Sequence, residues 1–167
     1  MKLHGSFSMN GKQYAKGDEV PWYTIYPFFA IHMLAFGASG FFMAYGGQVD
    51  DIAFLYMHGG VAIFAYSVFY LVVFGVDAVI WMFINAALGL FGIYSQIDWI
   101  LSRFGKSAED FAVHVHAIPF LYYVLYTFLL RQAVLDITRS REGSRRKIVD
   151  VLYVVVSLSV YSWLNFA

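Results

Sequence analysis

Three histidines are the residues of this chain best suited to chemistry. His58, His114 and His116 are expected within roughly 10 Å of the same membrane surface, counting ~1.5 Å of rise per helical residue. Asp51 and Asp110 precede them by a few residues and could add oxygen ligands. Imidazole and carboxylate groups together suit zinc, copper or iron. The five residues therefore form a candidate site for a transition metal.

The backbone around two of these histidines decides whether they can act together. His114 and His116 are two residues apart, and on an α-helix that spacing places them on nearly opposite faces. Pro119 bears on this, because proline is favoured in the first turn of a helix and costly farther in. If the helix begins next to Pro119, both imidazoles can turn inward. If it begins at Ala108, only one of them can meet His58.

Two other interpretations of the histidines stay open. One histidine from each of two helices at equal depth is how a b-type haem is held, so His58 with one of the later pair is an alternative haem site. In the structural interpretation, each histidine only packs and hydrogen-bonds a neighbouring carbonyl or carboxylate. His32, ~20 Å deep by the same helical rise, is expected to be structural and outside the cluster.

Apolar stretches must position all of these residues. The chain is 60% hydrophobic and 13% charged, whereas soluble domains carry about a quarter charged residues. A helix needs ~20 apolar residues to cross ~30 Å of hydrocarbon. We therefore predict an all-α membrane protein, an antiparallel bundle of four to five transmembrane helices. The expected spans are 22–45, 52–75, 78–101, 112–132 and 149–166, the last being the least certain because it is short and includes Asp150.

The first 21 residues are mostly polar and form a separate region before the membrane domain of residues 22–167. Asn10 and Gly11 lie between alternating apolar and polar residues, which predicts a short N-terminal β-hairpin. We expect Phe7, Met9 and Tyr14 to rest on the end of the bundle or on a partner.

Lysine and arginine residues predict the orientation of the chain. They are concentrated before the first span and between residues 139 and 147, and basic flanks are retained on the cytoplasmic side. The N-terminus and its hairpin are therefore expected in the cytoplasm, and the C-terminus on the other side if the fifth segment crosses. This bias, together with the short loops, favours a bacterial inner membrane.

The polar residues within or beside the spans are expected to be structural. Asp77 is placed to cap the third helix, and Arg131 to reach the lipid headgroups near Asp136 on a fourth helix that continues to Gly143. Asn85 lies among small residues and is expected to hydrogen-bond across a helix contact.

Several functions are excluded or disfavoured by composition. The sequence contains no cysteine, which excludes disulfides, thiolate metal sites and thiol nucleophiles. It carries zero formal net charge and no long basic tail, so nucleic acid is not an expected partner. No catalytic motif for hydrolysis is present, and the chain is not expected to be an enzyme on its own.

Three functions remain after these exclusions. Short loops and small-residue helix faces favour an accessory or scaffolding subunit of a larger membrane complex. The alternatives are a metal- or haem-binding redox subunit that uses the histidines, and a small oligomeric channel or carrier. The expected partners are the lipid bilayer and either other membrane subunits or further copies of the chain.

Overall fold

Five long helices make up most of the protein. The computed structural model describes residues 1–9, 11–46 and 52–166. All five helices are long and apolar enough to cross a membrane, which confirms the predicted segments by length and composition. In chain order the elements are β1 (Phe7–Met9), β2 (Lys12–Tyr14), α1 (Trp22–Tyr45), α2 (Ile52–Phe74), α3 (Val76–Ser102), the 3-10 turns η1 (Ala108–Asp110) and η2 (Val113–His116), α4 (Ala117–Ile137) and α5 (Gly143–Phe166).

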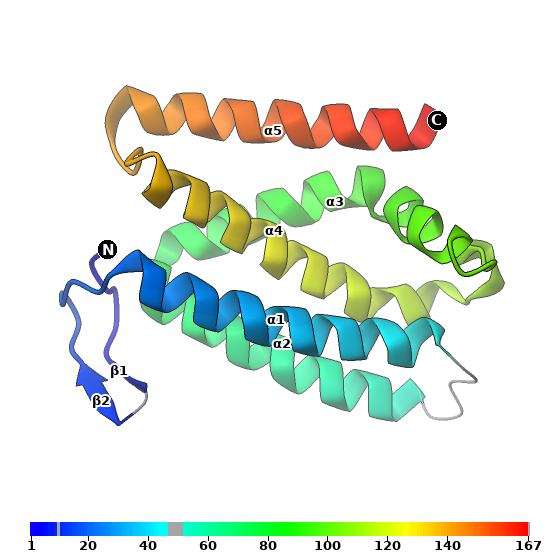
Figure 1. The fold of residues 1–167 in the computed structure, drawn as a ribbon, viewed down its shortest axis with the longest axis horizontal. Helices are drawn as coiled ribbons and strands as arrows, with labels where there is room; N and C mark the ends of the chain where they lie inside the picture. Colours follow the sequence, from blue (N-terminus) through cyan, green and yellow to red (C-terminus); the bar gives the residue numbers. More distant parts are fainter. Residues whose placement is uncertain (10, 47–51, 167) are drawn as a thin grey trace.

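Helix α4 is the centre of the fold. It packs against α1, α2, α3 and α5, whereas α5 lies on the outside and contacts α3 and α4 (Figure 1). The ring of Phe128 on α4 is fully buried, and it lies 5.1 Å from the ring of Tyr70 and 5.4 Å from that of Phe74, both on α2. Aromatic rings of this size supply much of the packed area inside the protein.

The N-terminal hairpin forms as expected and is attached to the helices. Strand β1 pairs antiparallel with β2, with Phe7 opposite Tyr14, and these two rings stack at 5.2 Å. Gly11 takes a positive φ of 74°, as a tight hairpin turn requires, while Asn10 lies outside the described residues. Phe7 and Tyr14 are partly buried against the core, as predicted, and nothing is described for the side chain of Met9.

A close approach at Gly75 fixes the N-terminal segment to the α2–α3 turn. The backbone N–H of His4 donates to the carbonyl of Val72 at 3.0 Å. Gly75 has φ +71°, and a Cβ built on it would lie 2.6 Å from Nδ1 of His4. Only glycine fits both the backbone conformation and the space at this position.

The start of α4 shows whether His114 and His116 belong to that helix, and its end corrects a prediction. Helix α4 begins at Ala117, with Pro119 in its first turn, so the segment that carries His114 and His116 is not part of it. The helix ends at Ile137 and does not continue to Gly143. Gly143 instead begins α5, with φ +69°, so α5 is longer than the predicted span 149–166.

Helices α4 and α5 meet at the same end of the molecule as the N-terminal hairpin (Figure 1). The η1–η2 connection and the end of α5 lie at the opposite end (Figure 1). The two basic regions of the sequence therefore share one end, as an antiparallel arrangement of five helices requires.

Candidate functional site

A buried arginine organises the end of the molecule near the hairpin. Arg131 on α4 is completely buried, and its Nε and Nη2 donate to one carboxylate oxygen of Asp150 on α5, at 2.9 and 2.6 Å. Its Nη1 lies 3.4 Å from the carboxylate of Asp77 on α3. The guanidinium also lies over the ring of Trp81, 3.5 Å from its centroid. One side chain thus connects three helices through charge and cation–π contact.

A second group of ions adjoins the first through Gln132. The side-chain amide of Gln132 donates to Asp77 at 3.3 Å, and its carbonyl oxygen accepts from Arg141 at 3.2 Å. Arg141 also donates to Asp136 at 2.6 Å, and the hydroxyl of Tyr26 on α1 donates to Asp136 as well. Burial alone would lower the pKa of Arg141, but the hydrogen bonds and negative charge of Asp136 outweigh it and raise that pKa.

Together these contacts form one continuous polar network with balanced charge. Arg146 on α5 completes it, because it bonds Asp77 and lies 3.7 Å from Asp150. Three arginines face three aspartates, and the network joins α1, α3, α4 and α5. Its members are Tyr26, Asp77, Arg131, Gln132, Asp136, Arg141, Arg146 and Asp150.

The network corrects three expectations drawn from the sequence. The N-cap residue of α3 is Gly75 without a side-chain hydrogen bond, so Asp77 binds arginines and does not cap the helix. Arg131 does not reach toward headgroups, since it is fully buried, and its partner is Asp150 and not Asp136. A signal was present in the sequence, because three acidic and three basic residues flank apolar segments at one membrane surface, but their pairing required the fold.

The predicted contact at Asn85 is confirmed. The hydroxyl of Tyr153 on α5 donates to the side-chain oxygen of Asn85 on α3, at 2.9 Å. The next turns of α3 carry Gly92, where a Cβ would lie 2.3 Å from the ring of Tyr161. Two aromatic side chains of α5 thus pack against small and polar residues of α3.

The histidines of the candidate metal site have separate partners. Nδ1 of His116 and the hydroxyl of Tyr45 lie 2.7 Å apart, and Nε2 of His116 is buried without a hydrogen-bond partner among the described residues. Nε2 of His58 lies 3.1 Å from the hydroxyl of Ser39. His114 is exposed, and its backbone carbonyl accepts from the hydroxyl of Tyr56 and from the backbone N–H of Ala117.

The two acidic members are not seen beside these histidines. Asp110 is exposed and accepts from the backbone N–H of Ser107 at 2.8 Å, and Asp51 lies outside the described residues. Within residues 1–9, 11–46 and 52–166, no three His, Asp or Glu side chains come close enough to hold a metal ion. A metal or haem site on these residues therefore stays a prediction.

His32 and His58 share a cavity that the sequence did not indicate. Both line an apolar cavity of about 590 Å³ between α1 and α2. Nδ1 of His32 lies 2.7 Å from the carbonyl oxygen of Phe28, one turn earlier, which agrees with the structural role expected for this histidine.

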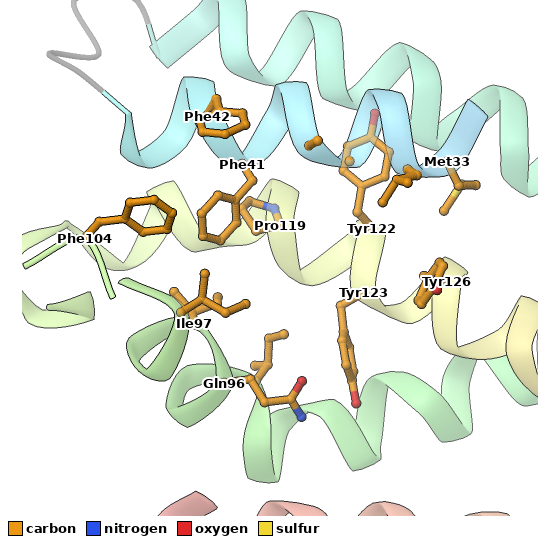
Figure 2. Close-up of a pocket in the computed structure, with 15 residues that line it drawn as sticks. Met33, Phe41, Phe42, Gln96, Ile97, Phe104, Pro119, Tyr122, Tyr123 and Tyr126 are labelled. Carbon is orange, nitrogen blue, oxygen red and sulfur yellow. The ribbon is translucent and has the colours of Figure 1, made fainter. Parts of the chain in front are cut away.

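A second apolar groove lies between α1 and α3, with α4 as its floor. Its volume is about 410 Å³, and tyrosines of α4 line it together with apolar residues of both walls. Phe41 and Phe104 lie at one end of the groove and Met33 and Tyr126 at the other (Figure 2). The groove forms because α1 and α3 both pack on α4.

Comparison of the chain with models of protein families, with curated protein sequences and with solved structures gives no match. Function must therefore be inferred from the geometry of the chain itself.

Proposed function

We propose that this chain is an integral membrane protein, with all five helices spanning the bilayer, and that it is an accessory or scaffolding subunit of a larger membrane complex. Helix α5 is its contact helix. The N-terminal hairpin lies on the cytoplasmic side, and a bacterial inner membrane is its location. The balance of lysine and arginine between the two ends supports this orientation.

The observation that carries the proposal is the exposure of α5. Among the described residues of this 24-residue helix, only Tyr161 is buried. About 44% of the apolar stretch Val113–Ile137 is buried, against 6% for that of α5. Helix α5 is held by the polar network, by Tyr153 and Tyr161, and by hydrogen bonds of Asn165 with Ser95 and Phe91 on α3. Most of its remaining surface is exposed.

Serine residues on that exposed surface favour a protein partner over lipid alone. Ser159 and Ser162 are both exposed, and residues three apart are neighbours on a helix surface. Leu152, Val155 and Phe166 extend the same stripe and are exposed. Small residues and hydroxyls concentrate where transmembrane helices meet, because they allow close approach and hydrogen bonds that lipid tails do not offer.

The charged groups of the network pair with one another, which supports a binding role of this protein over a catalytic one. The network neutralises its own charges, and its buried arginine is saturated by carboxylates and an aromatic ring. Such a network fixes the relative positions of α1, α3, α4 and α5, which is a structural role.

Site-specific photo-crosslinking in living cells tests the proposal. A photoreactive residue at Ser159 is expected to give one discrete adduct with a different membrane protein. The matched control is Phe64, which is 71% exposed on α2 and lies far from α5 in the fold. The absence of a discrete adduct at position 159, or equal adducts at both positions, would refute α5 as the contact helix. An adduct of twice the chain mass would favour the oligomeric channel instead.

A further inference from the structure

The groove between α1 and α3 opens on the outside of the molecule. Leu34, Phe42 and Phe104 line it, and their side chains are 68%, 64% and 65% exposed. Its walls belong to helices long and apolar enough to cross a membrane, so its open side faces hydrocarbon. The occupant must therefore be a molecule that enters from the bilayer.

The length of the groove fits a single hydrocarbon chain. Along α1 it runs from Met33 to Phe42, which is ~14 Å at the rise of an α-helix. That length matches one leaflet, since half of the hydrocarbon core is ~15 Å. The lining of the groove is predominantly apolar, as an acyl chain requires.

A cation lies at one end of the groove. Phe41, Phe42 and Phe104 also line an adjoining cavity of about 280 Å³, whose wall includes Lys106. The ammonium group of Lys106 donates to the carbonyl of Tyr45 at 2.5 Å, which uses one of its three N–H donors. The ammonium also lies 5.9 Å from the centroid of the Phe111 ring, and within residues 1–9, 11–46 and 52–166 no hydrogen bond uses its other two donors.

Two described acidic residues near Lys106 are engaged by other groups. Asp98 accepts from the hydroxyl of Ser107 at 2.9 Å and from the backbone N–H of Ala108 at 2.8 Å. The carboxylate of Asp110 is engaged by the backbone N–H of Ser107. The structure gives no salt bridge to Lys106 among the described residues, and Arg103 adds a second cation at this end, over the ring of Trp99.

We propose that this groove binds one anionic phospholipid, with an acyl chain between α1 and α3 and the phosphate group at Lys106. The apolar groove supplies the binding energy for the chain, and the lysine supplies the preference for an anionic headgroup. This site requires that the helices cross a membrane, but it does not depend on a protein partner at α5.

Native mass spectrometry of the purified chain with added phosphatidylglycerol or phosphatidylcholine tests the site. The expected result is one retained phosphatidylglycerol and a preference for it over phosphatidylcholine. Ala38→Phe fills the groove, because Ala38 lines it, and should abolish retention of both lipids. Ala35→Phe, on an exposed position of α1 that lines neither this groove nor the adjoining cavity, should retain the lipid.

The headgroup contact is tested separately. Lys106→Gln should weaken phosphatidylglycerol binding about fivefold and leave phosphatidylcholine unchanged. Lys147→Gln, at the opposite end of the molecule, should leave the binding of both lipids unchanged. Equal lipid retention by Ala38→Phe and Ala35→Phe would overturn the proposal, and so would unchanged headgroup preference in Lys106→Gln. A dimer that Ala38→Phe abolishes in the absence of lipid would assign the groove to a second copy instead.

Discussion

Arg131 donates two hydrogen bonds to a single carboxylate oxygen of Asp150, from Nε at 2.9 Å and from Nη2 at 2.6 Å. This pair ties the central helix α4 to the outer helix α5, which otherwise buries only one residue among those described. The guanidinium is fully buried and the side chain of Asp150 is 22% exposed, so the pair is largely shielded from water and strengthened by the low polarity around the arginine. The position of α5, and with it the proposed contact surface, depends on Arg131.

Replacing Arg131 by alanine should therefore destabilise the protein strongly. Among the described residues, the change leaves Arg146 as the one cation beside Asp77 and Asp150. Removing one partner of a buried ion pair costs about 3–5 kcal/mol. Arg131→Lys keeps the charge but loses the forked geometry, so its stability should lie between that of the natural protein and that of Arg131→Ala. The free energy of unfolding is measured by reversible denaturation in detergent. Arg145→Ala removes an exposed arginine outside the network. This change should alter the free energy of unfolding by less than about 0.5 kcal/mol. Equal stability of the two alanine variants would show that the ion pair does not hold α5.

The contact between Gly92 and Tyr161 should be equally sensitive to size. Gly92→Ala places a Cβ about 2.3 Å from the tyrosine ring, so α5 must move away from α3. We expect faster proteolysis in the link before α5 and a lower unfolding temperature. Gly60→Ala is the matched control, since its Cβ meets nothing within 4 Å and alanine favours a helix by about 0.5–1 kcal/mol. A Gly92→Ala protein as stable as Gly60→Ala would contradict the observed packing.

The sequence predicted most of the elements but not their contacts. Apolar length placed the first three spans within two residues of α1, α2 and α3, because a run of ~20 apolar residues has few other solutions. The start of α4 lies beside Pro119, which was one of the two starts that the sequence left open, and the predicted span 112–132 began earlier than the observed helix. The Asn-Gly pair indicated the hairpin, whose strands are observed on either side of it.

The partners of Arg131 were beyond the reach of the sequence. Asp77 and Asp150 are 54 and 19 residues away from it, and apolar patterning does not say which helices are neighbours. The same limit applies to the groove, which exists because α1 and α3 pack on α4. The partners of His58 and His116, which are Ser39 and Tyr45, likewise depend on side-chain directions that only the fold defines.

Orientation in the membrane can be measured on single-cysteine variants, because the natural chain contains no cysteine. Lys16→Cys and Glu109→Cys are exposed positions at the two ends. A membrane-impermeant maleimide should label Glu109→Cys and Phe166→Cys in intact cells, and Lys16→Cys only after the membrane is opened. Labelling of Phe166→Cys from the same side as Lys16→Cys would show that α5 does not cross.

Metal content follows from the histidine geometry. His58 and His116 each contact a hydroxyl of a different residue, so the accessory-subunit proposal predicts an isolated protein without stoichiometric zinc, copper or iron. Elemental analysis and an absorption spectrum measure metal and haem. One equivalent of metal, or a haem band, that is lost in the His58→Ala/His116→Ala double variant would establish the redox alternative.

The most direct test of the proposed function is the mass of the particle that contains this chain when it is extracted from its native membrane with surrounding lipid. We predict a particle that contains at least one other membrane protein in fixed ratio, and its dissociation when Ser159 is replaced by tryptophan. The matched variant Phe64→Trp should leave the particle intact. A uniform monomer that carries only lipid would contradict the account.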